Sequence, residues 1–143
     1  MTQAKMTRKH LLLIDCEEDR RYVTQMGLEL MTDWKIWVAH SYSEGFNLAQ
    51  NQKPHAILVN LTSLEANPLE ILQQLLAHPA TQHIPIILTL DRLRRTDQQH
   101  FNQLGVAGAI AQPYDCTNLG EQIADFLNWE REFPSSNLRL KRG

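Results

Sequence analysis

Three short apolar runs constrain the fold of this chain more than any other feature. They lie at His10–Asp15, Ala56–Leu61 and Ile84–Leu90, and none of them shows a polar alternation. Such runs are typical of strands that are buried on both faces, as in a parallel sheet covered by helices. Two weaker strands are expected at Trp34–Ala39, which alternates as an edge strand does, and at Val106–Ala111. The sequence therefore predicts an α/β fold.

Each predicted strand is followed by a segment with the signals of a helix. Between Asp19 and Met31, apolar residues recur at three- and four-residue steps, which indicates an amphipathic helix; they are Tyr22, Val23, Met26 and Leu30. Three later helices are predicted from their start signals, which are the capping boxes Ser41 to Glu44 and Thr96 to Gln99 and the pair Asn67-Pro68. The last helix is predicted from an apolar stripe that begins near Thr117 and fades near Glu132. Strand then helix, repeated five times, predicts a parallel sheet with right-handed crossovers and helices on both faces.

Length and charge indicate one domain with basic ends. The chain has 143 residues, enough to bury one core. We expect a basic arm at 1–9, a domain at 10–132 and a basic tail at 133–143. The arm and the tail hold six of the 14 bases and no acid, which leaves eight bases against sixteen acids between them. An acidic body makes a uniformly basic nucleic-acid surface improbable, although the two tails should lie on one side of the domain and could touch a polyanion without sequence preference.

The remaining composition argues against several other classes. No apolar run approaches the roughly 18 residues that cross a bilayer, so we expect no membrane association and a cytoplasmic location. Cys16 and Cys116 are too few for a disulfide framework and suggest reduced thiols. His78 and His83 are five residues apart, which fits no zinc pattern.

The working site of an open parallel sheet lies at the carboxyl ends of its strands. Polar residues gather at those ends in this chain, and they define the candidate pocket: Asp15, Cys16, Glu17, Asn60, Thr62, Thr89 and Gln112. Arg92, Arg94 and Arg95 form a basic loop over the same face, either as contacts for an acidic partner or anion or as a solvated charge run.

Four segments give the chain a resemblance to the receiver domain of two-component response regulators. They are Leu11-Leu-Leu-Ile-Asp-Cys-Glu17, Pro54-His-Ala-Ile-Leu-Val-Asn60, His83-Ile-Pro-Ile-Ile-Leu-Thr89 and Ala109-Ile-Ala-Gln-Pro113. The resemblance covers residues 10–130 and implies a flavodoxin-like sheet of strand order 2-1-3-4-5. It also implies a stand-alone signalling protein of the phosphorelay type that is not an enzyme. Its partners would be proteins, and its contact face, also suited to a homodimer, would be the fourth helix, fifth strand and fifth helix.

The chain departs from the family at the residues that carry its chemistry. The family's acceptor aspartate corresponds to Asn60, whose carboxamide cannot form an acyl phosphate. The second metal-binding acid corresponds to Cys16 and the conserved lysine to Gln112, so we expect weak magnesium binding or none and no other cofactor. Asp15 is left nearly alone as a metal-binding acid, and even with Glu17 the two carboxylates and a neutral amide would make a poor magnesium site. These departures predict a pseudo-receiver that acts without phosphorylation of Asn60.

Several residues carry two interpretations each. Asn60 and Gln112 could form a hydrogen-bonded pair in an abandoned site, and Cys16 could be inert or reactive. Trp129 could be an exposed anchor or a core residue. The rival to a signalling module is a small flavodoxin-like ligand- or nucleotide-binding domain, but no glycine-rich phosphate loop follows the first strand.

Overall fold

The apolar runs form the centre of a parallel sheet in the computed structural model, which describes residues 8–61, 68–91, 95–112 and 114–129. The strands are β1 (His10–Ile14), β2 (Lys35–Ala39), β3 (Ala56–Asn60), β4 (Ile86–Leu90) and β5 (Gly108–Ala111). The helices are α1 (Glu18–Met31), α2 (Tyr42–Gln52), α3 (Pro68–Ala77), α4 (Arg95–Leu104) and α5 (Leu119–Leu127). Within the described ranges the sheet has five strands in the order β2-β1-β3-β4-β5, as predicted.

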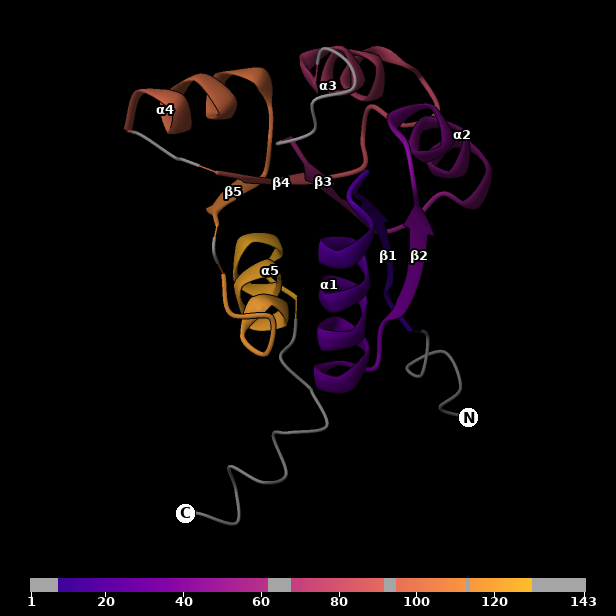
Figure 1. The fold of residues 1–143 in the computed structure, drawn as a ribbon. Helices are drawn as coiled ribbons and strands as arrows, with labels where there is room; N and C mark the ends of the chain where they lie inside the picture. The colour runs from indigo at the N-terminus through magenta and orange to yellow at the C-terminus, as the bar shows by residue number, and fades with distance from the viewer. Residues whose placement is uncertain (1–7, 62–67, 92–94, 113, 130–143) are drawn as a thin grey trace, which may run out of the picture.

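Helices cover both faces of this sheet (Figure 1). On one face α2, α3 and α4 bury alternate strand residues such as Leu12 and Val59 together with Leu75. On the other face α1 and α5 cover Leu13 and Leu58. Because the three central strands are buried on both sides, their sequences lack polar alternation. At the edge, β2 pairs with β1 alone, which confirms the edge position predicted from its alternation.

Helix α1 is where the sequence prediction and the structure differ most. Its start is fixed by Glu17, whose carboxylate accepts the backbone N–H groups of Asp19 (3.2 Å) and Arg20 (2.7 Å). The side buried against the sheet consists of Thr24, Gly27 and Leu28. The apolar residues that indicated the helix are exposed instead: Tyr22, Val23, Met26 and Leu30. The helix was predicted correctly, but the stripe that predicted it faces solvent.

Gly27 lets α1 approach the segment that leads into α5. A Cβ at this position would lie 2.8 Å from the Cβ of Cys116 and 2.9 Å from its carbonyl oxygen, so the backbone of one segment would have to shift. Helix propensity alone favours alanine by about 1 kcal/mol, whereas overpacking costs about 1 to 3 kcal/mol. We therefore expect Gly27→Ala to lower the free energy of unfolding by about 1 kcal/mol, measured by urea denaturation. The exposed Glu29→Ala should change it by less than about 0.5 kcal/mol, and a stabilising Gly27→Ala would contradict the close packing.

The ends of the described chain meet at the amino edge of the sheet. The Lys9 ammonium lies 5.2 Å from the ring centroid of Trp129, so the described chain begins and ends on one side of the domain. Residues 1–7 of the predicted basic arm and all of the predicted basic tail lie outside the described residues. Trp129 is half-buried and packs edge-on against Trp34 at 5.0 Å, so it serves as a packing residue rather than as an exposed anchor.

The start of helix α4 differs from the prediction. The helix begins at Arg95, one residue before Thr96. The prediction that Thr96 is its N-cap is therefore wrong.

Candidate functional site

Three buried polar side chains meet at the carboxyl edge of the sheet, as the strand-end rule predicted. Asp15 follows β1 directly, Asn60 ends β3, and Thr89 lies beside Asn60 in the register of β4. Each of the three is only 1% exposed. Asp15 and Asn60 flank the switch point, where the sheet order reverses between β1 and β3.

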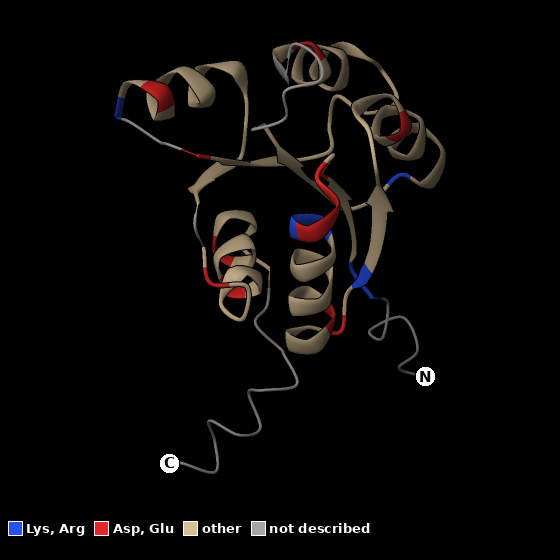
Figure 2. Ribbon diagram, viewed as in Figure 1, with Lys and Arg blue, Asp and Glu red and all other residues tan. Residues whose placement is uncertain are grey.

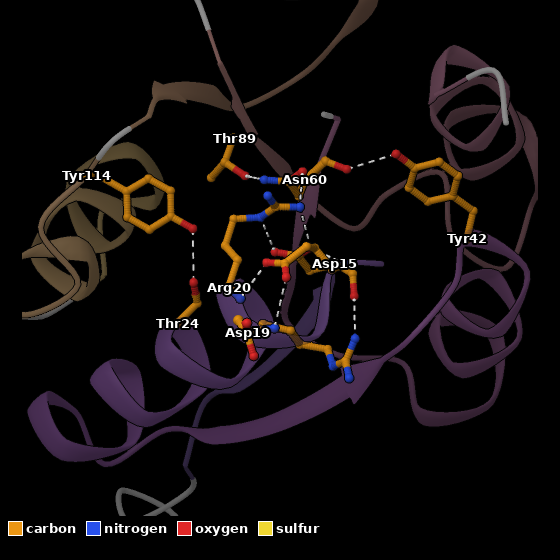
Figure 3. Close-up of polar contacts among 10 residues, drawn as sticks. Asp15, Asp19, Arg20, Thr24, Tyr42, Asn60, Thr89 and Tyr114 are labelled. Carbon is orange, nitrogen blue, oxygen red and sulfur yellow. Dashed lines mark hydrogen bonds and ion pairs between the residues drawn. The ribbon is translucent and has the colours of Figure 1, made fainter. Parts of the chain in front are cut away.

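Arg20 brings a positive charge into the middle of this site (Figure 3). Its Nε donates to Oδ2 of Asp15 at 2.8 Å, and its Nη2 donates to Oδ1 of Asp15 at 2.7 Å. The same Nη2 also donates to Oδ1 of Asn60 at 3.0 Å. One guanidinium therefore bridges the two buried oxygens that stand at the ends of β1 and β3.

The ion pair has the geometry that gives arginine its strongest contacts with carboxylates. Two parallel N–H donors meet both oxygens of Asp15, and the hydrogen bonds from Arg20 raise the pKa of the guanidinium further. Arg21 adds a hydrogen bond from Nη1 to the carbonyl oxygen of Asp15 at 3.0 Å. The first turn of α1 therefore supplies a cation to Asp15.

Asn60 uses both ends of its carboxamide. Its Oδ1 accepts from Arg20, while its Nδ2 donates to Oγ1 of Thr89 at 2.9 Å. The hydroxyl of Tyr42 donates to the Asn60 carbonyl oxygen at 2.9 Å and anchors the end of β3 from α2. A neutral amide suits this position, because it can accept from a cation on one side and donate to a hydroxyl on the other.

Gln112 does not pair with Asn60, so the predicted amide pair is wrong. Strand β4 lies between β3 and β5, and its Thr89 takes the contact with Asn60. The Nε2 of Gln112 is buried and finds no hydrogen-bond partner in the described part of the chain. It lines a pocket of about 310 Å³ between α1 and the segment after β5, beside Tyr114 and Cys116.

The other predicted pocket and contact residues lie apart from this hydrogen-bonded site or outside the described residues. Glu17 is exposed and caps α1, and the backbone N–H of Arg20 is the main cause that lowers the pKa of its carboxyl. Cys16 is half-buried and packs against the core beneath α2 and α3. Arg95 is exposed at the start of α4, whereas Thr62, Arg92 and Arg94 lie outside the described residues.

The thiol of Cys116 and the hydroxyl of Tyr114 are held in their neutral forms. Burial raises the pKa of both groups, and the Tyr114 hydroxyl lies 3.0 Å from Oγ1 of Thr24. A thiol with a raised pKa is a poor nucleophile at neutral pH. Cys116 is thus a packing residue under α1, consistent with its contact with Gly27.

The site does not fit the magnesium ion that the fold implies. A hard dication needs several oxygen ligands around one point. Here the guanidinium of Arg20 already lies between Asp15 and Asn60, and it donates a hydrogen bond to the side-chain oxygen of each. Across the described ranges, no group of three or more His, Cys, Asp or Glu side chains is placed to hold a metal ion. The arrangement supplies its own cation instead.

Sequence reasoning missed Arg20 and Tyr42. A helical side chain leans toward the amino end of its helix, so an arginine in the first turn after β1 can reach back to the end of that strand. That was the available signal for Arg20. Tyr42 carried none, because its contact depends on how α2 packs beside β3.

The chain has the CheY-like fold of response-regulator receivers, with the sheet order β2-β1-β3-β4-β5. The chemotaxis response regulator CheY4 of Vibrio cholerae matches with a TM-score of 0.73 at 16% identity, over 84% of this chain and 99% of that one. A CheY-like receiver domain protein of Methanospirillum hungatei matches with a TM-score of 0.72 at 19% identity, over 85% and 95%. No family model matches the chain.

A sequence relative agrees with the structural neighbours. The response regulator Rre1 of Synechocystis is 24% identical over 117 residues, which cover 82% of this chain and 51% of that protein. The chain therefore spans about half the length of the curated relative that it matches. Among the described residues, no helix has the length and apolar character needed to span a membrane.

Proposed function

We propose that this domain is a pseudo-receiver, a cytoplasmic signalling module that binds protein partners and does not depend on phosphorylation of Asn60. The observation that carries the proposal is the guanidinium of Arg20, which bridges Asp15 and Asn60 at 2.7 and 3.0 Å. A cation that belongs to the chain takes the place between the two strand ends. The domain is not an enzyme in this proposal.

The chemistry of Asn60 supports the same conclusion. A carboxamide oxygen is a weak nucleophile and yields no acyl phosphate. Its oxygen accepts from Arg20, and its nitrogen donates to Thr89, so both ends are engaged in the folded chain. The hydroxyl of Thr89 accepts that bond, which ties β3 to β4 at the site.

The resemblance to receivers also suggests where the domain meets other molecules. The face formed by α4, β5 and α5 carries two exposed large apolar residues, Leu104 on α4 and Phe126 on α5. The other exposed positions of α4 are polar. We retain this face as the place for a homodimer, since apolar side chains amid polar ones suit a reversible contact.

The first test of the proposal is phosphorylation of the full chain. Incubation with acetyl phosphate and magnesium should leave its intact mass unchanged, because no carboxylate stands at position 60. A receiver that has the acceptor aspartate serves as the positive control in the same reaction. A phosphoryl adduct mapped to Asp15 or to Asn60 by mass spectrometry would refute a phosphorylation-silent module.

A further inference from the structure

The edge of the sheet opposite the hydrogen-bonded site gathers basic and aromatic side chains. Lys9, Lys35 and Lys53 are exposed at or shortly before the starts of β1, β2 and β3. Trp37 in β2 and Trp129 after α5 are half-buried at the same edge. We call these five residues the amino-edge surface. The hydrogen bonds of the carboxyl-edge site run among other residues, so this surface is a separate feature of the molecule.

Two of the lysines lie over the two rings. The ammonium of Lys9 is 5.2 Å from the ring centroid of Trp129, and that of Lys35 is 5.1 Å from the ring centroid of Trp37. Trp129 packs against the core under α1 and α5, whereas Trp37 packs against the core under α2 and α3, so the surface extends around the end of the sheet. A cation beside a flat ring suits single-stranded nucleic acid, which has phosphates to neutralise and nucleobases to stack.

Charge in the described chain is unevenly divided between the two edges of the sheet. The described segments that lead into the strands are residues 8–10, 32–35, 53–56, 82–86 and 105–108. These segments hold one acid, Asp33, beside Arg8 and the three lysines of the amino-edge surface. At the opposite edge, Arg20 and Arg21 are outnumbered by the acids around the end of β1 and the start of α1 (Figure 2), which are Asp15, Glu17, Glu18 and Asp19. The acidic net charge of the domain therefore does not extend to the amino edge.

The ionisation of His55 reflects the positive charge at this edge. Burial lowers the pKa of its imidazole, and the nearby charges of Lys9 and His10 lower it further. The Nδ1 of His55 accepts the backbone N–H of His10 at 2.8 Å, which holds the ring between β1 and β3. A further positive charge is disfavoured at such a place, whereas an anion is attracted to it.

Lys53 stands at a backbone position that does not favour a lysine. It ends α2 with a φ of 48°, in the left-handed region that glycine and asparagine normally occupy. Strain of this kind is concentrated at functional positions. Fold stability does not explain why a lysine stands here, whereas the need for an exposed positive charge at the amino edge does.

The chain also enters and leaves the described domain at this edge. The described residues begin at Arg8 and end at Trp129, beside Lys9. Residues 1–7 carry one lysine and no acid, and residues 130–143 carry four basic residues and two acids. Both sequences are joined to the domain next to the amino-edge surface, and their net positive charge strengthens the attraction of a polyanion.

We propose that the amino-edge surface binds single-stranded nucleic acid without sequence preference. Nucleobases stack on the rings of Trp37 and Trp129, and the three lysines neutralise phosphates. An acidic protein segment would use the lysines but not the rings, and a duplex keeps its nucleobases in its own stack. The inference goes beyond the proposed function, because it adds a second contact at the edge opposite the Arg20 bridge.

The first test is fluorescence anisotropy of a labelled thymidine dodecamer mixed with the full chain at about 50 mM salt. The dodecamer should bind, and binding should weaken steeply as salt is added. The triple variant Lys9→Gln, Lys35→Gln and Lys53→Gln should bind at least about tenfold more weakly, with the slope of log K against log salt reduced by about 2. Arg95→Gln, which removes an exposed arginine on α4, is the matched control and should leave binding unchanged.

Two further variants separate stacking and charge from folding. Trp37→Leu should weaken binding about tenfold, and the dodecamer should quench the tryptophan fluorescence of the wild type more than that of this variant. Lys53→Gly should weaken binding about threefold while its urea midpoint stays the same or rises, because glycine relieves the left-handed position. A weaker binder that is no less stable excludes unfolding as the cause.

Three outcomes would overturn this inference. Polyglutamate that binds as tightly as the dodecamer would assign the surface to an acidic protein, and a DNA duplex that binds as tightly would remove the role of the rings. Binding that survives the triple variant but is lost in Arg139→Gln, Lys141→Gln and Arg142→Gln would place the contact on the tail. A phosphorylated chain refutes the proposed function alone, whereas a chain that ignores the dodecamer refutes the amino-edge surface alone.

Discussion

Replacing Arg20 with methionine should destabilise the domain by roughly 3 kcal/mol. The change keeps the length and helix propensity of the side chain but leaves the Asp15 carboxylate, which is 1% exposed, without its ion pair. Removing one partner of a buried pair strands the other charge in a poorly solvated place. Because the Arg20 side chain keeps 25% of its surface in solvent, we take the lower end of the usual range. Urea unfolding of the full chain measures the loss.

Arg21→Met is the matched control for this substitution. Arg21 is the neighbouring arginine on the same helix, but it donates to a backbone carbonyl and not to the carboxylate. Its loss should cost only about 1 kcal/mol. Adding Asp15→Asn to Arg20→Met should recover part of the stability, because the stranded charge is gone. An Arg20→Met protein as stable as the wild type would contradict the ion pair.

The second large effect concerns magnesium. In the double variant Arg20→Met with Asn60→Asp, two carboxylates face each other at the ends of β1 and β3 with no cation between them. A divalent ion should then bind, and at ten times its dissociation constant it adds about 1.4 kcal/mol. That gain corresponds to a rise in melting temperature of roughly 3 to 6 °C.

The single variant Asn60→Asp separates the two roles of the site. With Arg20 in place, the new carboxylate gains a hydrogen-bonded cation at the position where Oδ1 of Asn60 now accepts. We therefore expect a stability within about 1 kcal/mol of the wild type and no response to magnesium. A melting temperature that rises with magnesium in Asn60→Asp as much as in the double variant would show that Arg20 does not occupy the metal's place.

The sequence predicted the sheet well because burial leaves a direct mark on composition. Strands buried on both faces must be apolar throughout, so β1, β3 and β4 could be located without a structure. The strand-end rule then brought Asp15, Asn60 and Thr89 together, as the structure has them. These predictions depend on backbone topology, which the order of the elements determines.

Side-chain partners were harder to predict. The Arg20 bridge depends on how far one side chain reaches back across a helix turn, and the absence of an Asn60–Gln112 pair depends on Thr89 filling the space between two strands. The orientation of α1 was misjudged for another reason. A periodic apolar stripe indicates a helix but does not say which side meets the core, and here Gly27 and Leu28 pack inward.

The central claim is that Arg20 serves as the permanent cation of the site. Side-chain ¹H–¹⁵N spectra of the full chain test it most directly, with Arg20→Met identifying the Arg20 Nε–H signal and Asn60→Asp removing the Asn60 amide signal. We expect the Arg20 Nε–H to exchange slowly with water, and we expect its signal and that of the Asn60 amide to stay in place as millimolar magnesium is added. Magnesium that shifts both signals, or an Arg20 Nε–H that exchanges as fast as that of the exposed Arg95, would contradict it.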